Sequence, residues 1–153
     1  MPPAGAEMER TLKKDVWIHI KGLLRDDDDE EDKTELYTQG SYYKKNGSYY
    51  ITYEESETTG FAGCRTVLKV DGANKVSLVR HGDSRSHLMI ERGERNVGYY
   101  NTGVGELMIG VSAHDIDVKL DDRGGQLYFS YSLDVNSTHI SDNEVFISVK
   151  EMN

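Results

Sequence analysis

The chain contains histidine and other reactive side chains, but their spacing matches no common metal site. Its five histidines are His19, His81, His87, His114 and His139. No two of them are four residues apart, as the paired zinc ligands of a helical motif would be. His81 and His87 form the densest group, and a polar turn at Gly82-Asp83 accounts for them. We therefore predict no metal site and no cofactor.

The nucleophiles and carboxylates also lack a catalytic pattern. Cys64 is the single cysteine, and it shares the apolar face of an alternating stretch with Leu68 and Val70. It is therefore expected to be a small buried hydrophobic residue, and it excludes an internal disulfide. The carboxylates that could form an acid–base pair are Glu54, Glu55, Glu57 and Glu91. Nothing fixes the separation that such pairs need, and no nucleophile elbow or phosphate-binding loop occurs, so we predict no catalytic residue and no enzyme.

Two charged residues could instead contact a ligand. Arg80 and Glu91 each follow two alternate residues of a stripe on the same strand face. If both stripes face inward, the two charges lie near one end of the protein interior. A buried charge needs a partner, so these residues either pair, or reach solvent, or Arg80 holds an acidic head group. Tyr53 and Tyr99 would help to orient such a ligand, because tyrosine combines an apolar ring with one polar tip.

The segment from Tyr37 to Glu55 organises the predicted fold. It contains six of the ten tyrosines, in two β-prone runs on either side of Asn46-Gly47. Asn-Gly is the strongest local signal for a two-residue type I′ turn, because both residues tolerate a positive φ. This segment therefore predicts a tight β-hairpin.

Short alternating stretches fill the rest of the chain. In Asp15–Leu24, Val16, Ile18 and Ile20 share one face, and Trp17, His19 and Lys21 share the other. Leu107–Ala113 and Ile116–Leu120 are two further stripes, separated by His114-Asp115. About ten such stretches joined by turn signals indicate an all-β sandwich or barrel. Because most connections look like tight hairpins, we predict a closed or nearly closed antiparallel up-and-down β-barrel of about eight to ten strands.

The length of 153 residues suits one domain. We expect a flexible lead-in over 1–14 and a single barrel over 15–153. Seven consecutive acidic residues, Asp26 to Asp32, lie within the barrel segment. They predict a solvated loop, because the alternating oxygen ligands and central glycine of an EF-hand calcium loop are absent.

Net charge and hydropathy limit the partners. The formal net charge is −9, and no basic cluster occurs that would suit nucleic acid or an anionic membrane. No apolar run has the length of a signal peptide or a membrane span. We therefore expect a cytoplasmic protein with no nucleic-acid or membrane partner.

Several segments resemble a known family when they are taken in order. They are T-Q-G-S-Y-Y-K-K-N-G-S-Y-Y-I-T-Y-E-E at 38–55, T-V-L-K-V at 66–70, V-S-L-V-R-H-G at 76–82, M-I-E at 89–91, N-T-G-V-G-E-L at 101–107, and 125–133. With them the chain, from Val16 to Glu151, resembles the YwiB-like family of bacterial proteins. The resemblance implies a calycin-type (lipocalin-like) barrel in the cytoplasm of a Gram-positive bacterium, and it implies no activity.

Two functions from different classes fit these observations. The first is a barrel that binds a small apolar or acidic ligand inside, oriented by Arg80, Tyr53 and Tyr99. This hypothesis fails if side chains fill the interior. The second is a non-enzymatic protein-interaction module. It would use the acidic loop 26–32 to meet a basic partner, or an aromatic barrel wall to form a homodimer.

Overall fold

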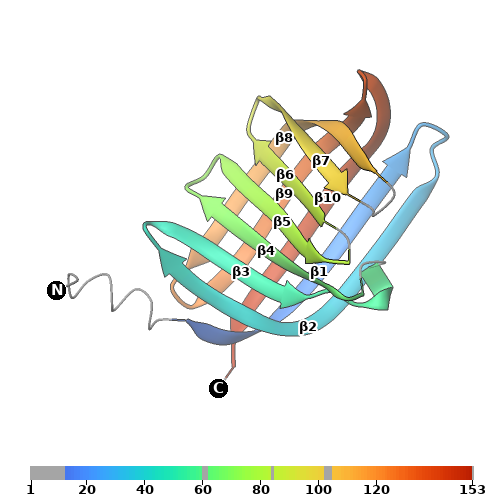
Figure 1. Ribbon diagram of the computed structural model, residues 1–153. Coiled ribbons are helices and arrows are strands. Elements are labelled where there is room, and N and C mark those ends of the chain that lie inside the picture. Colours follow the sequence, from blue (N-terminus) through green and yellow to red (C-terminus); the bar gives the residue numbers. More distant parts are fainter. Residues whose placement is uncertain (1–12, 60–61, 84, 102–104, 153) are drawn as a thin grey trace.

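The computed structural model describes residues 13–59, 62–83, 85–101 and 105–152, and β-strands dominate it (Figure 1). The strands are β1 (Lys14–Asp26), β2 (Glu31–Lys45), β3 (Ser48–Glu54), β4 (Cys64–Asp71), β5 (Lys75–Gly82), β6 (Arg85–Glu91), β7 (Arg95–Asn101), β8 (Glu106–Asp121), β9 (Gly124–Val135) and β10 (Thr138–Glu151). A 3₁₀ turn, η1 (Glu57–Thr59), follows β3. In this part of the chain no helix is long and apolar enough to cross a membrane.

Two predicted features fall partly outside the described residues. Of the lead-in expected over 1–14, residues 1–12 lie outside, and Lys14 already belongs to β1. Residues 102–104 of the glycine-broken segment also lie outside.

The strands form a closed antiparallel barrel in the order β1-β10-β9-β8-β7-β6-β5-β4-β3-β2. Each strand pairs with its neighbours in the sequence, and β1 pairs with both β2 and β10, which closes the ring. Closure removes the two open edges that a flat meander would expose. The structure therefore confirms the predicted up-and-down barrel.

The barrel has one tall wall and one short wall. Strands β1, β2, β8, β9 and β10 contain 12 to 16 residues, whereas β3 to β7 contain seven or eight. In Figure 1 the β1–β2 hairpin extends well beyond the short strands. The acidic residues 27–32 lie at its tip, and all of them are exposed.

Alternate side chains point into the barrel and form its core. Val16 and Ile18 of β1, Ile51 of β3 and Phe129 of β9 are almost completely buried, and among the described residues every other strand except β7 contributes similar ones. Cys64 is buried at 1% exposure, as its apolar strand face predicted. Apolar packing of this kind is the main stabilising contribution in a domain of this size.

The central hairpin has the predicted turn. Asn46 and Gly47 both adopt positive φ, 52° and 83°, as a type I′ turn requires. The turn sets the register in which Tyr43 pairs with Tyr50, and their rings stack at 4.9 Å on the outer face. The Tyr42 and Tyr49 rings stack at 5.4 Å on the inner side.

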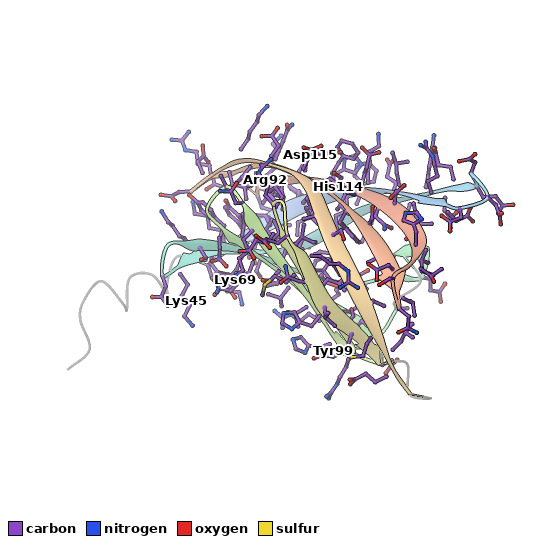
Figure 2. All side chains as sticks on the ribbon, turned by 90° about the horizontal axis from the view of Figure 1, so that it is seen from above. Lys45, Lys69, Arg92, Tyr99, His114 and Asp115 are labelled. Carbon is purple, nitrogen blue, oxygen red and sulfur yellow. The ribbon has the colours of Figure 1, made fainter. Side chains whose placement is uncertain are left out.

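One strand is longer than predicted. The stripes around Ala113 and Ile116 are a single strand, β8, with a bulge where the register shifts between these residues. Two residues there, His114 and Asp115, oppose the single residue Ser130 of β9, and both are exposed. The Arg92 guanidinium donates to the Ile116 carbonyl and so braces the bulge, which lies beside Arg92 in Figure 2.

Candidate functional site

A row of polar side chains crosses the barrel interior near one end. Each member of the row pairs with the next across neighbouring strands: Tyr53 of β3 with Thr66 of β4, Thr66 with Arg80 of β5, and Arg80 with Ser86 of β6. All four side chains point inward and are buried. Glu55, which directly follows β3, joins this interior polar row. Its carboxylate accepts a hydrogen bond of 2.8 Å from the Thr66 hydroxyl and lies 3.9 Å from the Arg80 guanidinium. Two of the predicted ligand residues, Arg80 and Tyr53, are therefore brought together.

The electrostatics of this row favour internal pairing over ligand capture. The side chains of Arg80 and Glu55 are only 10% and 1% exposed, so each charge is compensated mainly by the other. Arg80 also donates to the Ser86 hydroxyl at 3.3 Å. Burial, reinforced by the nearby Glu55 carboxylate, raises the pKa of the Tyr53 phenol well above its ordinary value. Arg80 thus has a partner within the barrel, as the pairing alternative predicted.

The other two predicted residues, Glu91 and Tyr99, lie elsewhere. The inward face of β6 contains Leu88 and Ile90, so Glu91 points outward at the strand's far end, where its partner is Lys75. The expectation that Arg80 and Glu91 lie near one end was wrong, because Arg80 pairs with Ser86 whereas Glu91 pairs with Lys75 at the opposite end of β5. Tyr99 lies on the outer face of β7 with its ring edge-on to His87, and Figure 2 shows it on the outside of the barrel.

A groove of about 700 Å³ lies on the outside of the tall wall, over β1, β2 and β10. We call it the outer groove. Its lining residues are Trp17, Ile18, His19, Tyr37, Thr38, Gln39, Ser148 and Lys150. Apolar atoms make up most of the lining, although Trp17 is 51% and Tyr37 72% exposed. Large aromatic rings left open to solvent beside a groove are typical of binding surfaces.

The aromatic wall of the outer groove is held in place before any ligand arrives. His19 and Tyr37 are direct cross-strand partners, and their rings stack at 4.1 Å with an interplanar angle of 6°. The Glu35 carboxylate holds both rings: it accepts a hydrogen bond from the Tyr37 hydroxyl and lies 3.3 Å from Nε2 of His19. These two contacts, that of Tyr37 first, lower the pKa of Glu35. The carboxylate is therefore charged at neutral pH.

A chain of polar contacts crosses the same side of the barrel near the acidic loop. The Ser132 hydroxyl lies 2.6 Å from an Asp142 oxygen and 2.7 Å from Nε2 of His114. His139 bridges Asp142 and Asp27, which ties the acidic loop to the β9–β10 hairpin. Hydrogen bonds to Asp142 and Asp27 raise the pKa of His139.

These polar contacts around Ser132 are not arranged for nucleophilic catalysis. A carboxylate only accepts, so the one hydroxyl hydrogen of Ser132 goes to Asp142. His114 must then donate to Ser132, which means that it does not act as the base that would activate this serine. Among the described residues, no group of three or more histidine, cysteine or acidic side chains is arranged to hold a metal ion.

The sequence contained a signal for the outer groove that our selection of site residues did not use. Trp17 and His19 lie on the outward face of an alternating strand, opposite Val16 and Ile18. Exposing the large apolar ring of a tryptophan to water is unfavourable, so a tryptophan on an otherwise polar strand face indicates a binding surface. Tyr37 could not be added from the sequence, because its place beside His19 depends on the β1–β2 register.

Comparisons with known proteins define the class first. The crystal structure of the ywiB protein from Bacillus subtilis superposes with a TM-score of 0.76, over 93% of this chain and 94% of that chain, at 22% identity. The chain is thus a β-barrel protein of that fold. The family model described as "Domain of unknown function (DUF1934)" matches residues 18–147, so the chain belongs to this family.

A curated relative agrees with this assignment. The "Uncharacterized beta-barrel protein YwiB" of Bacillus subtilis (strain 168) is 28% identical over 129 residues, which is 84% of each chain. The predicted YwiB-like membership is therefore confirmed.

Proposed function

We propose that this protein is a non-enzymatic binding protein that takes up a small, mainly apolar molecule in the outer groove. The observation that carries the proposal is the open aromatic pair, Trp17 and Tyr37, beside about 700 Å³ of mostly apolar space. Sites for small ligands commonly have volumes of about 300–1,000 Å³ and apolar linings with a few polar groups. Gln39, Ser148 and Lys150 supply such groups here.

A ligand inside the barrel has weaker support. Among the described residues, inward side chains of every strand except β7 pack into one core, and the polar row at its end is internally paired. The outer groove needs no rearrangement of the core, because its floor is the β1–β2 backbone and its walls are already exposed.

The outer groove can supply part of the free energy of binding by covering exposed apolar surface. Covering about 100 Å² of the Trp17 ring would contribute about 2.5 kcal/mol, at roughly 25 cal/mol per Å². Neighbouring apolar atoms would add to this value. The stacked and hydrogen-bonded Tyr37 loses little conformational freedom on binding, which reduces the entropic cost.

The experiment uses the chain's one tryptophan as the reporter. Trp17 lines the outer groove, so its fluorescence should be quenched by energy transfer when the neutral apolar dye N-phenyl-1-naphthylamine binds. Tyr37→Ser should weaken the dye's affinity at least about tenfold, because it removes one wall. Tyr99→Ser is the matched control, since it removes an exposed tyrosine from β7 on another wall.

Unchanged affinity in Tyr37→Ser, or equal losses in both variants, would overturn the proposal. Sedimentation velocity on the same samples tests the alternative that this wall is an interface between two copies of the protein. If a second copy covers this wall, the wild-type protein will sediment as a dimer and the dye will compete with dimerisation.

A further inference from the structure

The two ends of the outer groove differ in charge. Lys150 and Gln39 are the cross-strand partners of Trp17 and mark one end. Glu35 lies just beyond the other end, past Tyr37 and opposite Lys21, where it lines a neighbouring hollow. A ligand lying along the aromatic wall therefore meets a cation at one end and a carboxylate at the other.

Only the negative end is already matched. The Glu35 carboxylate accepts a hydrogen bond from the Tyr37 hydroxyl and lies beside Nε2 of His19, and the positive charge of Lys21 is also close by. Lys150, by contrast, forms no ion pair within 4.0 Å with any carboxylate in the described part of the chain. The acidic residue next to it, Glu151, is engaged by Lys14 at 2.5 Å.

A second hollow lies next to Lys150. This hollow, of about 370 Å³, lies at the β8–β9 turn, and Lys150 lines both it and the outer groove. Two further cations, Lys119 and Arg123, also line it, and two carboxylates, Asp121 and Glu151, balance their charge.

We infer that the ligand of the outer groove is an amphipathic organic anion, with its apolar body between Trp17 and Tyr37 and its anionic head group at Lys150. This inference rests on the proposed function and deepens it. A carboxylate or sulfonate at this end meets a cation with no partner carboxylate. Lys150 would repel a cationic ligand, and a neutral ligand would make the apolar contacts only.

Two dyes with a shared ring system test the head group. N-phenyl-1-naphthylamine is neutral, whereas 8-anilinonaphthalene-1-sulfonate adds one sulfonate to the same rings. Lys150→Gln should weaken binding of the sulfonate dye about three- to fivefold and leave the neutral dye within about twofold, as expected for one solvent-exposed charge pair. Added salt should weaken the sulfonate dye in the wild type and have less effect in Lys150→Gln.

The matched control is Lys69→Gln. Lys69 also lies beside an aromatic ring, 5.9 Å above Tyr50, but on the outer face of β4. The Lys69→Gln substitution removes the same net charge from another wall, so the ratio of the two dye affinities in this variant should equal that of the wild type.

The outcomes separate the inference from the proposed function. If neither dye binds, or if Tyr37→Ser leaves both unchanged, the proposed groove is wrong. If both dyes bind and depend on Tyr37, but Lys150→Gln leaves their ratio unchanged, the groove stands and the head-group inference is overturned. An equal change of the ratio in Lys69→Gln would also overturn it, because the effect would then be one of net charge.

Discussion

Two tyrosine–glutamate pairs on this barrel have the same chemistry and opposite surroundings. Tyr53 and Glu55 lie inside, and Glu35 and Tyr37 lie on the outer wall. In each pair the residues are two positions apart, the phenol is hydrogen-bonded to the carboxylate, and a basic side chain lies close by: Arg80 inside and His19 outside.

The difference is the access of water and of partners. Inside, the carboxylate is needed because Arg80 has left water, so the pair completes the core. Outside, the charges are solvated whether or not they pair, so the pair adds little stability. It fixes the orientation of two aromatic rings at the edge of a groove. The two pairs consist of the same residue types, so residue type alone does not show which pair serves the core and which serves the groove. The difference in burial does.

The strongest way to break this comparison is Glu55→Ala. It leaves the Arg80 charge buried with no carboxylate, which should lower the free energy of unfolding by about 3–5 kcal/mol. Urea denaturation at neutral pH measures the change. The double variant Glu55→Leu/Arg80→Met is the control, and it should regain much of the loss because neither charge remains.

A loss below about 1 kcal/mol in Glu55→Ala would contradict this account. Arg80 would then not depend on Glu55, and the original hypothesis of a ligand anchor inside the barrel would regain support.

Alkaline titration sharpens the contrast at a smaller scale. The pKa of both phenols is raised, that of Tyr53 chiefly by burial and that of Tyr37 by its hydrogen bond to Glu35. The unfolded chain ionises tyrosine near pH 10. Stability from the protonated Tyr53 is therefore fully present below pH 10 and is lost as the pH rises towards the higher folded-state pKa.

Tyrosinate absorbance followed against pH should show both behaviours. Tyr37 should ionise reversibly in the folded barrel, whereas Tyr53 should ionise only as the barrel unfolds. Tyr53→Phe should cost about 1 kcal/mol at neutral pH and should make the alkaline loss of stability less steep. A Tyr53→Phe protein with the wild-type alkaline profile would show that this phenol is not protected.

Local patterns in the sequence were sufficient for the fold. Strict alternation in β1 set which residues face inward, and Asn46-Gly47 set the turn and register of the central hairpin. Both signals act within a few residues, so no knowledge of distant contacts was needed. The β8 bulge at His114-Asp115 was read as a break between strands, because a polar interruption looks the same in either case.

The site depends on registers between strands, and these were not predictable from local patterns. Glu55 meets Arg80 across three strands, so the sequence could show that Arg80 needs a partner but not which one. Glu91 was assigned to the wrong face because Met89 and Ile90 are both apolar. Tyr37 and His19 stack only because β1 and β2 pair in one register.

The smallest expected effect comes from the outer pair itself. Glu35→Gln keeps the size of the side chain and removes the charge that holds Tyr37 and His19. Because the site is solvated, the thermal midpoint should stay at the wild-type value, while affinity for N-phenyl-1-naphthylamine should fall about two- to threefold through loss of preorganisation. Glu54→Gln, an exposed glutamate at the end of β3, controls for the lost charge. A lowered midpoint with unchanged affinity would reverse the roles assigned to the two pairs, because the outer one would then serve stability and not the groove.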